Sequence, residues 1–226
     1  MPLSARDPTP SRLNKDSHWY IEIVAQARLG NVLAFDTLFE YYNTRICTYL
    51  AHIVGDNEEG RDLAQETFLK AWQGIGSIHD EARFDTWLYR IATRTAIDHL
   101  RRRKFRWSHG ETNQFDNTSS NLYISGPEEQ VAEQEHIRQA LAKVSLKYRT
   151  CLLLQLVADF SQRQIAASLN ISEKSVSVYV SRGSEQFRLA YQQLSQPNEQ
   201  IVKERGKTHD KIESNALFGL GSEAFS

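Results

Sequence analysis

Cysteine is scarce in this chain, since 226 residues include only Cys47 and Cys151. Neither belongs to a CxxC pair or has a neighbouring histidine, which argues against a zinc site. Both fall within apolar helical patterns far apart in the sequence. We therefore interpret them as buried thiols of a protein in a reducing compartment.

Long apolar runs are also missing. No run approaches the roughly 18 residues that a membrane-spanning helix needs. The first residues, Met1–Arg6, contain no apolar segment of the kind found in secretion signals. We expect a soluble protein that acts in the cytoplasm and does not insert into membranes.

Catalytic and metal-binding motifs are absent as well. The seven histidines show no metal-ligand spacing, and the chain has neither a nucleophile motif nor a phosphate-binding loop. The sequence therefore predicts a protein that is not an enzyme, has no catalytic residues and needs no metal or cofactor.

The chain has no large excess of charge, because its formal net charge is -1. Any contact with nucleic acid must therefore come from a local concentration of charge. Five of the six residues 101–106 are basic, whereas residues 56–66 include five acids and one arginine. Separate segments of opposite charge suit a protein that links DNA to a large protein assembly.

The pattern of apolar residues predicts an all-α fold of two small helical domains joined by a flexible linker. Apolar residues recur every three or four positions from about Trp19, and no strand-like alternation or internal repeat is present. The linker is polar and lacks a helical period. The expected parts are a disordered N-terminus (1–18), a first domain (19–106), the linker (107–127), a second domain (128–195) and a disordered tail (196–226).

Capping residues place the helices of the first domain. Asn31 is predicted to cap a long helix, and Asp56 or Asn57 to cap the next helix, which ends near Trp72. A loop follows at residues 74–81, and the last helix is expected from about Arg83 to Lys104.

Arginines form a row on that last helix. Their spacing of seven, four and seven residues places four of them within a sector of about 40°: Arg83, Arg90, Arg94 and Arg101. Three aromatic residues lie near the row: Phe84, Trp87 and Tyr89. Such a surface suits single-stranded DNA, because guanidinium groups contact phosphates while rings stack on unpaired bases. The alternative is a solvated charged face with Trp87 in the core.

A helix-turn-helix pattern spans Ser161–Arg182. Asn170 stands at the turn, where a left-handed backbone is needed, and Ser172 is placed to cap the second helix. That helix is expected to present its outward side chains to a major groove: Lys174, Ser175, Ser177, Val178, Ser181 and Arg182. The alternative is two packed helices of an ordinary bundle.

Together these motifs resemble the RNA polymerase sigma factors of the extracytoplasmic-function (ECF) class of the sigma-70 family. The resemblance rests on the run Asp62–Phe68 followed by Phe84-x-x-Trp-Leu-Tyr-Arg-Ile-Ala92. It covers roughly residues 30–106 as region 2 and 128–194 as region 4. It implies a factor that binds core polymerase, directs it to specific promoters and promotes DNA melting.

The resemblance also assigns surfaces. Asp62, Gln65 and Glu66 would dock on the coiled coil of the polymerase β′ subunit. Opening of the minus-ten element would fall to the 74–82 loop and the following helix, through Phe84, Trp87, Arg90, Arg94 and Arg101. The 172–182 segment would read the minus-thirty-five element. The implied partners are promoter DNA and core polymerase, which would be bound through its β′ coiled coil and its β flap. An anti-sigma factor is a further implied partner, because sigma factors of this class are commonly bound by one.

Five positions, in three segments, depart from the family pattern. Arg94 stands where the family usually has Asn, so the minus-ten site is expected to read a different base or to grip more by charge. Ser177 and Tyr179 replace two usual basic residues, which predicts weaker phosphate contact in the recognition helix. Val144-Ser145 replaces the usual Leu-Pro at the entry to region 4.

Two other interpretations remain at this stage. A stand-alone helix-turn-helix regulator would bind duplex DNA tightly by itself, but it leaves the acidic helix unexplained. The second is a protein-interaction adaptor whose partner is an inhibitor. It does not exclude a sigma factor, because sigma factors of this class are commonly bound by an anti-sigma factor. The tail contains an apolar patch, Ala216–Leu220, that is either a docking peptide or disordered surplus.

Overall fold

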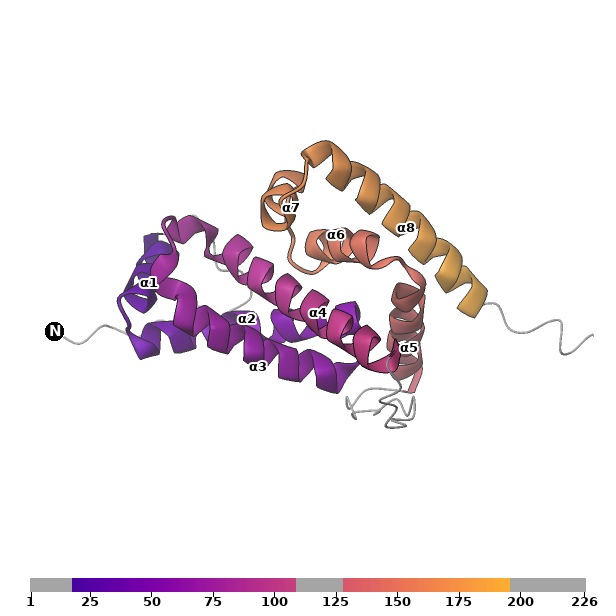
Figure 1. The fold of residues 1–226 in the computed structure, drawn as a ribbon, viewed down its shortest axis with the longest axis horizontal. Coiled ribbons are helices and arrows are strands. Elements are labelled where there is room, and N and C mark those ends of the chain that lie inside the picture. Colours follow the sequence, from indigo (N-terminus) through magenta and orange to yellow (C-terminus); the bar gives the residue numbers. More distant parts are fainter. Residues whose placement is uncertain (1–17, 109–127, 196–226) are drawn as a thin grey trace, which may run out of the picture.

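The computed structural model describes residues 18–108 and 128–195. The expectations for the N-terminus, most of the linker and the tail lie outside these ranges. Within them the all-α prediction is confirmed (Figure 1). The helices are α1 (His18–Arg28), α2 (Val32–Val54), α3 (Asn57–Gly74), α4 (Phe84–Ser108), α5 (Glu128–Lys143), α6 (Leu146–Leu156), α7 (Gln162–Leu169) and α8 (Glu173–Ser195), with short 3₁₀ turns η1 (Ile75–Ser77) and η2 (Glu81–Arg83) between α3 and α4.

The predicted caps begin α2 and α3, and a glycine ends α2. The Asn31 side chain accepts a hydrogen bond from the backbone N–H of Ala34 at the start of α2. Asp56, rather than Asn57, caps α3, with its carboxylate 2.8 Å from the backbone nitrogen of Glu59. Gly55 ends α2 in the left-handed region at φ 84°. Its lack of a side chain allows this reversal between two long helices.

Helices α1–α4 enclose a core with several buried tyrosines. Their hydroxyl groups are satisfied mainly by one another and by threonine: Tyr20 and Tyr42 are 2.8 Å apart, and Tyr49 is 2.7 Å from Thr93. Such hydrogen bonds offset the cost of burying the polar groups. They also fix α4 against α2, so the outer face of α4 keeps a defined orientation.

Gly60 sets the close approach of α3 to α2. A Cβ at this position would lie 2.6 Å from both the Cα and the backbone nitrogen of Ala51. We therefore expect Gly60→Ala to force the helices apart and to lower the free energy of unfolding by about 2 kcal/mol or more, measured by urea denaturation. Gly76→Ala is the matched control, because its Cβ would meet nothing within 4 Å. Equal stability of the two variants would contradict this account.

In the second domain, α8 packs across α5, α6 and α7 (Figure 1). Gly183 is buried where α8 crosses α6, and a Cβ there would lie 3.1 Å from the backbone oxygen of Tyr148. The two helices therefore approach at this point almost to backbone contact. Side chains next to the crossing are brought together as a result.

The two domains are in contact, which the sequence did not predict. Helix α7 packs on α4, while α5 and α6 pack on α2. The rings of Tyr89 and Phe160 meet edge to face at 5.1 Å between centroids. Arg138 of α5 donates a hydrogen bond to the carbonyl oxygen of Gly55, and Glu135 holds the same guanidinium at 2.5 Å. We call these four residues the interdomain contact: Gly55, Tyr89, Arg138 and Phe160.

Candidate nucleic-acid interface

The acidic surface predicted on α3 is present, but its members differ in accessibility. Asp62 and Gln65 are exposed. Glu66 is half-buried and forms an ion pair of 2.6 Å with Lys70. Lys70 in turn donates to the hydroxyl group of Thr95 on α4, 3.1 Å away. Glu66 is therefore partly occupied in holding α3 to α4, whereas Asp62 is available to a partner.

Leu69 belongs to the same face of α3 and was missed in the sequence analysis. Its side chain is 58% exposed, although it lies within an apolar helical pattern. It stands seven residues after Asp62, so the two project from nearly the same side of the helix. That heptad spacing was the signal that could have identified it. An exposed leucine beside carboxylates gives the surface an apolar contact as well as charge.

Three arginines of the predicted row lie on α4. The fourth, Arg83, ends η2 just before α4 and forms an ion pair of 2.8 Å with Asp80. Arg90, Arg94 and Arg101 are all exposed, and Arg101 lies 3.7 Å from the carboxylate of Asp98. In the part of the chain that the structure describes, Arg90 and Arg94 have no ion-pair or hydrogen-bond partner. Two unpaired guanidinium groups on one helical face form a site for anions such as DNA phosphates.

The aromatic residues beside the row have different positions. Trp87 is half-buried and packs against the core. Its ring is therefore neither fully exposed for stacking on a base nor fully enclosed in the core. Gly74 borders its ring, since a Cβ there would lie 3.4 Å from the indole. Phe84 is fully buried between Tyr42 and Trp87. Tertiary packing thus removes the Phe84 ring from the surface in this structure, and its contact with DNA stays a prediction.

A further aromatic residue, Phe105, is 62% exposed near the end of α4. It lies eleven residues after Arg94, close to three helical turns, and so falls near the side of the arginine row. Phe105 was not predicted from the sequence, because the surrounding residues 101–106 stand out mainly by their charge.

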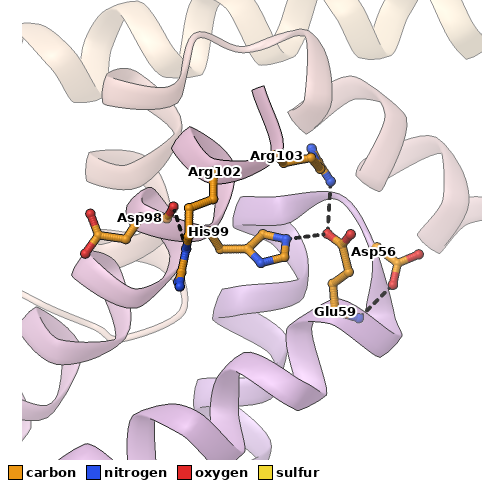
Figure 2. Close-up of polar contacts among 6 residues, drawn as sticks. All are labelled: Asp56, Glu59, Asp98, His99, Arg102 and Arg103. Atoms are coloured by element: carbon orange, nitrogen blue, oxygen red, sulfur yellow. Dashed lines mark hydrogen bonds and ion pairs between the residues drawn. The ribbon is translucent and has the colours of Figure 1, made fainter. Parts of the chain in front are cut away.

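The basic end of α4 is fixed to the start of α3 by Glu59 (Figure 2). Its carboxylate lies 3.2 Å from Nε2 of His99 and 2.9 Å from Nη1 of Arg103. Arg102 bonds the backbone oxygen of Asp98. These contacts hold α4 rigid where its basic residues are concentrated.

The predicted turn of the helix-turn-helix is confirmed. Asn170 ends α7 with left-handed backbone angles, φ 55° and ψ 49°. Ser161 and Gln164 form a capping box at the start of α7. The hydroxyl group of Ser172 accepts a hydrogen bond of 3.1 Å from the backbone N–H of Ser175. The start of α8 is thus held at a defined angle to α7.

Most of the predicted contact residues of α8 face solvent. Ser175 is the exception, because it is half-buried and its hydroxyl group lies 2.8 Å from that of Ser172. This pair is engaged in capping, which leaves less of either side chain for a base edge. The others are exposed: Lys174, Ser177, Val178, Ser181 and Arg182.

Two protein-family models match the chain. Sigma-70 region 2 matches residues 38–106, and sigma-70 region 4 matches residues 134–187. The ECF RNA polymerase sigma factor SigW of Bacillus subtilis is 31% identical over 173 residues, which is 73% of this chain and 92% of SigW. The chain belongs to the ECF class of the sigma-70 family. It is a sigma factor and not an enzyme.

Another relative of this sigma factor is the RNA polymerase sigma-H factor of Pseudomonas aeruginosa. It is 29% identical over 181 residues, which is 76% of this chain and 94% of that protein. The solved structure of the sigma factor RpoE with the anti-sigma factor NepR from Bartonella quintana matches the fold. Its TM-score is 0.62 at 17% identity, over 71% of this chain and 98% of that one.

Within the described ranges, this sigma factor has neither a candidate metal site nor a membrane-spanning helix. Residues 18–108 and 128–195 contain no group of three His, Cys, Asp or Glu side chains placed to hold a metal ion. Over the same ranges, no helix is both long and apolar enough to span a membrane.

Burial raises the pKa of the Cys151 thiol to about 11. That thiol is therefore a poor metal ligand and a poor nucleophile.

Proposed function

We propose that this sigma factor binds core polymerase and the two promoter elements through three separate surfaces. The exposed carboxylate of Asp62, with Gln65, Glu66 and Leu69, docks on the β′ coiled coil of core polymerase. The unpaired arginines of α4 contact the minus-ten strand, and the exposed face of α8 reads the minus-thirty-five duplex. The observation that carries this proposal is the opposite charge of two neighbouring faces, acidic on α3 and basic on α4.

For the minus-ten element, charge and aromatic surface act together. Arg90 and Arg94 hold the backbone of the separated strand, because they are exposed and have no competing carboxylate within the described ranges. The half-buried Trp87, bordered by Gly74, offers a ring edge to an unpaired base. Phe84 supports Trp87 from beneath, at 5.9 Å between ring centroids. Its role is to position that ring.

For the minus-thirty-five element, α8 supplies mostly small polar side chains. Ser177 and Ser181 reach base edges by single hydrogen bonds, and Lys174 adds one positive charge. Such a surface binds weakly by itself. Polymerase compensates by holding both domains close to the promoter, which raises the effective concentration of each site.

The remaining partners follow from the same assignment. Region 4 contacts the β flap of polymerase, and the protein acts in the cytoplasm, where bacterial polymerase works. An anti-sigma factor is a further proposed partner, because the fold matches a sigma factor solved with one. A stand-alone regulator is the weaker candidate, since it gives no role to the exposed acids of α3.

In-vitro transcription tests the proposal. Core polymerase is incubated with a pool of promoter fragments, with and without the full chain. We expect start sites that appear only with the protein and share sequence motifs near minus ten and minus thirty-five. Core binding without new transcripts would contradict the promoter assignments of α4 and α8. Absence of core binding, together with tight binding of the free protein to duplex DNA, would favour the stand-alone regulator.

A further inference from the structure

Lys147 and Arg182 both contact Tyr148 where α6 and α8 cross. They come together because Gly183 allows the helices to approach almost to backbone contact at Tyr148. Ser145, just before α6, adds a second connection through its backbone N–H, which donates to the side chain of Gln186 at 3.1 Å. The relative position of the two cations is therefore set by the packing of two helices and not by a mobile loop. We call this group the α6–α8 corner: Lys147, Tyr148, Tyr179 and Arg182.

Two aromatic rings hold the cations in place. The Lys147 ammonium lies 4.9 Å from the centroid of the Tyr148 ring and 5.5 Å from that of Tyr179. The two rings are 5.4 Å apart. Nη1 of Arg182 donates to the hydroxyl oxygen of Tyr148 at 3.2 Å, and this bond lowers the pKa of that phenol. Cation–π contacts and a hydrogen bond to an uncharged phenol orient the two cations without neutralising them.

Neither cation is neutralised by an acid. Over residues 18–108 and 128–195, no carboxylate lies within ion-pair distance of Lys147 or Arg182. Both side chains are exposed. Arg188, one to two turns further along α8, differs because it is paired with Glu185 at 2.9 Å. The corner is therefore a site of uncompensated positive charge, which favours an anion with several oxygens.

The corner lies at the edge of the recognition face. At about 100° per residue, Arg182 projects about 40° from Val178, within the exposed sector, and Tyr179 lies about 60° further toward the core. Lys147 sits over Tyr179 and thus flanks the recognition face on its α6 side. Tyr179 is one of the two positions where the family usually has a basic residue. The ammonium of Lys147, which belongs to α6, thus places a positive charge at this edge of α8, where Tyr179 supplies none.

We propose that Lys147 and Arg182 together bind one phosphate of the DNA backbone at the edge of the minus-thirty-five major groove. This inference rests on the proposed role of α8 as the duplex-reading helix. The ligand is a phosphodiester and not a base edge, so the contact contributes affinity and register but no sequence preference. Tyr148 and Tyr179 are positioning residues that keep the two cations apart from acids and aimed at the same strand.

The test uses holoenzyme assembled with the full chain and a promoter selected by in-vitro transcription. Equilibrium binding is measured across a series of KCl concentrations for Lys147→Gln and Arg182→Gln. We expect each variant to bind roughly 3- to 10-fold more weakly and to reduce the slope of log K against log salt by about 1. Discrimination between the matched and a mutated minus-thirty-five sequence is expected to stay unchanged. Lys147→Arg, which keeps the charge, is expected to retain affinity and slope.

Arg188→Gln is the matched control, because it removes a cation of α8 that already has a carboxylate partner. It is expected to leave the slope unchanged. An unaltered slope for Lys147→Gln would overturn the phosphate site, and so would a loss of discrimination between sequences. Ser177→Ala removes a proposed base contact and so tests the role of α8 separately. If it reduces discrimination while Lys147→Gln has no effect, only the phosphate site at the α6–α8 corner fails. If binding does not depend on the minus-thirty-five sequence at all, the role of α8 fails.

Discussion

Asp62→Arg is expected to lower the affinity for core polymerase by about 100-fold. Asp62 is exposed on the acidic face of α3, and a partner that binds this face is expected to present positive charge. The substitution therefore turns an attraction into a repulsion between like charges. The fold is expected to persist, because the side chain makes no contact that packing needs. The measurement is titration of labelled protein with core polymerase, with circular dichroism and thermal unfolding to check the fold.

Glu22→Arg is the matched control for this experiment. Glu22 is an exposed acid on α1 that contacts only Gln26 of its own helix within the described residues. The same exchange of charge there is expected to leave core affinity unchanged. Glu66→Arg is a poorer test by itself, because it also breaks the ion pair with Lys70. Unchanged affinity of Asp62→Arg would remove the docking assignment of α3.

Arg94→Ala is expected to slow promoter opening about 10-fold while weakening the closed complex by no more than about 2-fold. Its guanidinium is exposed, unpaired within the described ranges and close to Trp87 on the helix. Such a group gains a partner mainly when the separated strand reaches α4. Opening is followed by the permanganate reactivity of unpaired thymines, and closed-complex formation by binding at low temperature.

A template with a mismatched bubble at minus ten makes this test sharper. The strands are already apart, so the defect of Arg94→Ala in opening rate is expected to disappear on it. Arg102→Ala is the control, because that side chain bonds the backbone of Asp98 on another side of α4. Equal losses in binding and opening would mean that Arg94 acts only as a phosphate contact in the closed complex.

Local features of this fold were predictable from the sequence. The caps Asn31 and Ser172 and the turn residue Asn170 depend on the backbone preferences of single residues, and each occupies its expected place. The arginine row followed from helical spacing alone. The burial of Phe84 could not be predicted, because it depends on tertiary contacts. Its ring is covered by Tyr42 and Trp87, and no periodicity distinguishes a ring in the core from one at the surface.

The α6–α8 corner could not be predicted for a similar reason. Tyr179 was identified only as a missing positive charge, because the sequence places Lys147 on a different helix. The packing of α8 on α6 brings the positive charge of Lys147 to Tyr179, and this packing depends on the small size of Gly183. The interdomain contact also joins segments far apart in the chain. Helical patterns define each helix but not its neighbour.

The interdomain contact also carries a polar cost that separation of the two domains would relieve. Burial raises the pKa of Tyr89, and within the described residues its hydroxyl group has no hydrogen-bond partner. Separation would let this group bond to water, while Arg138 and the carbonyl of Gly55 would exchange their bond for hydration, so opening costs less than the buried apolar area implies. A partner that binds the separated domains more tightly shifts the population toward them by its difference in affinity, and one that spans both domains has the opposite effect.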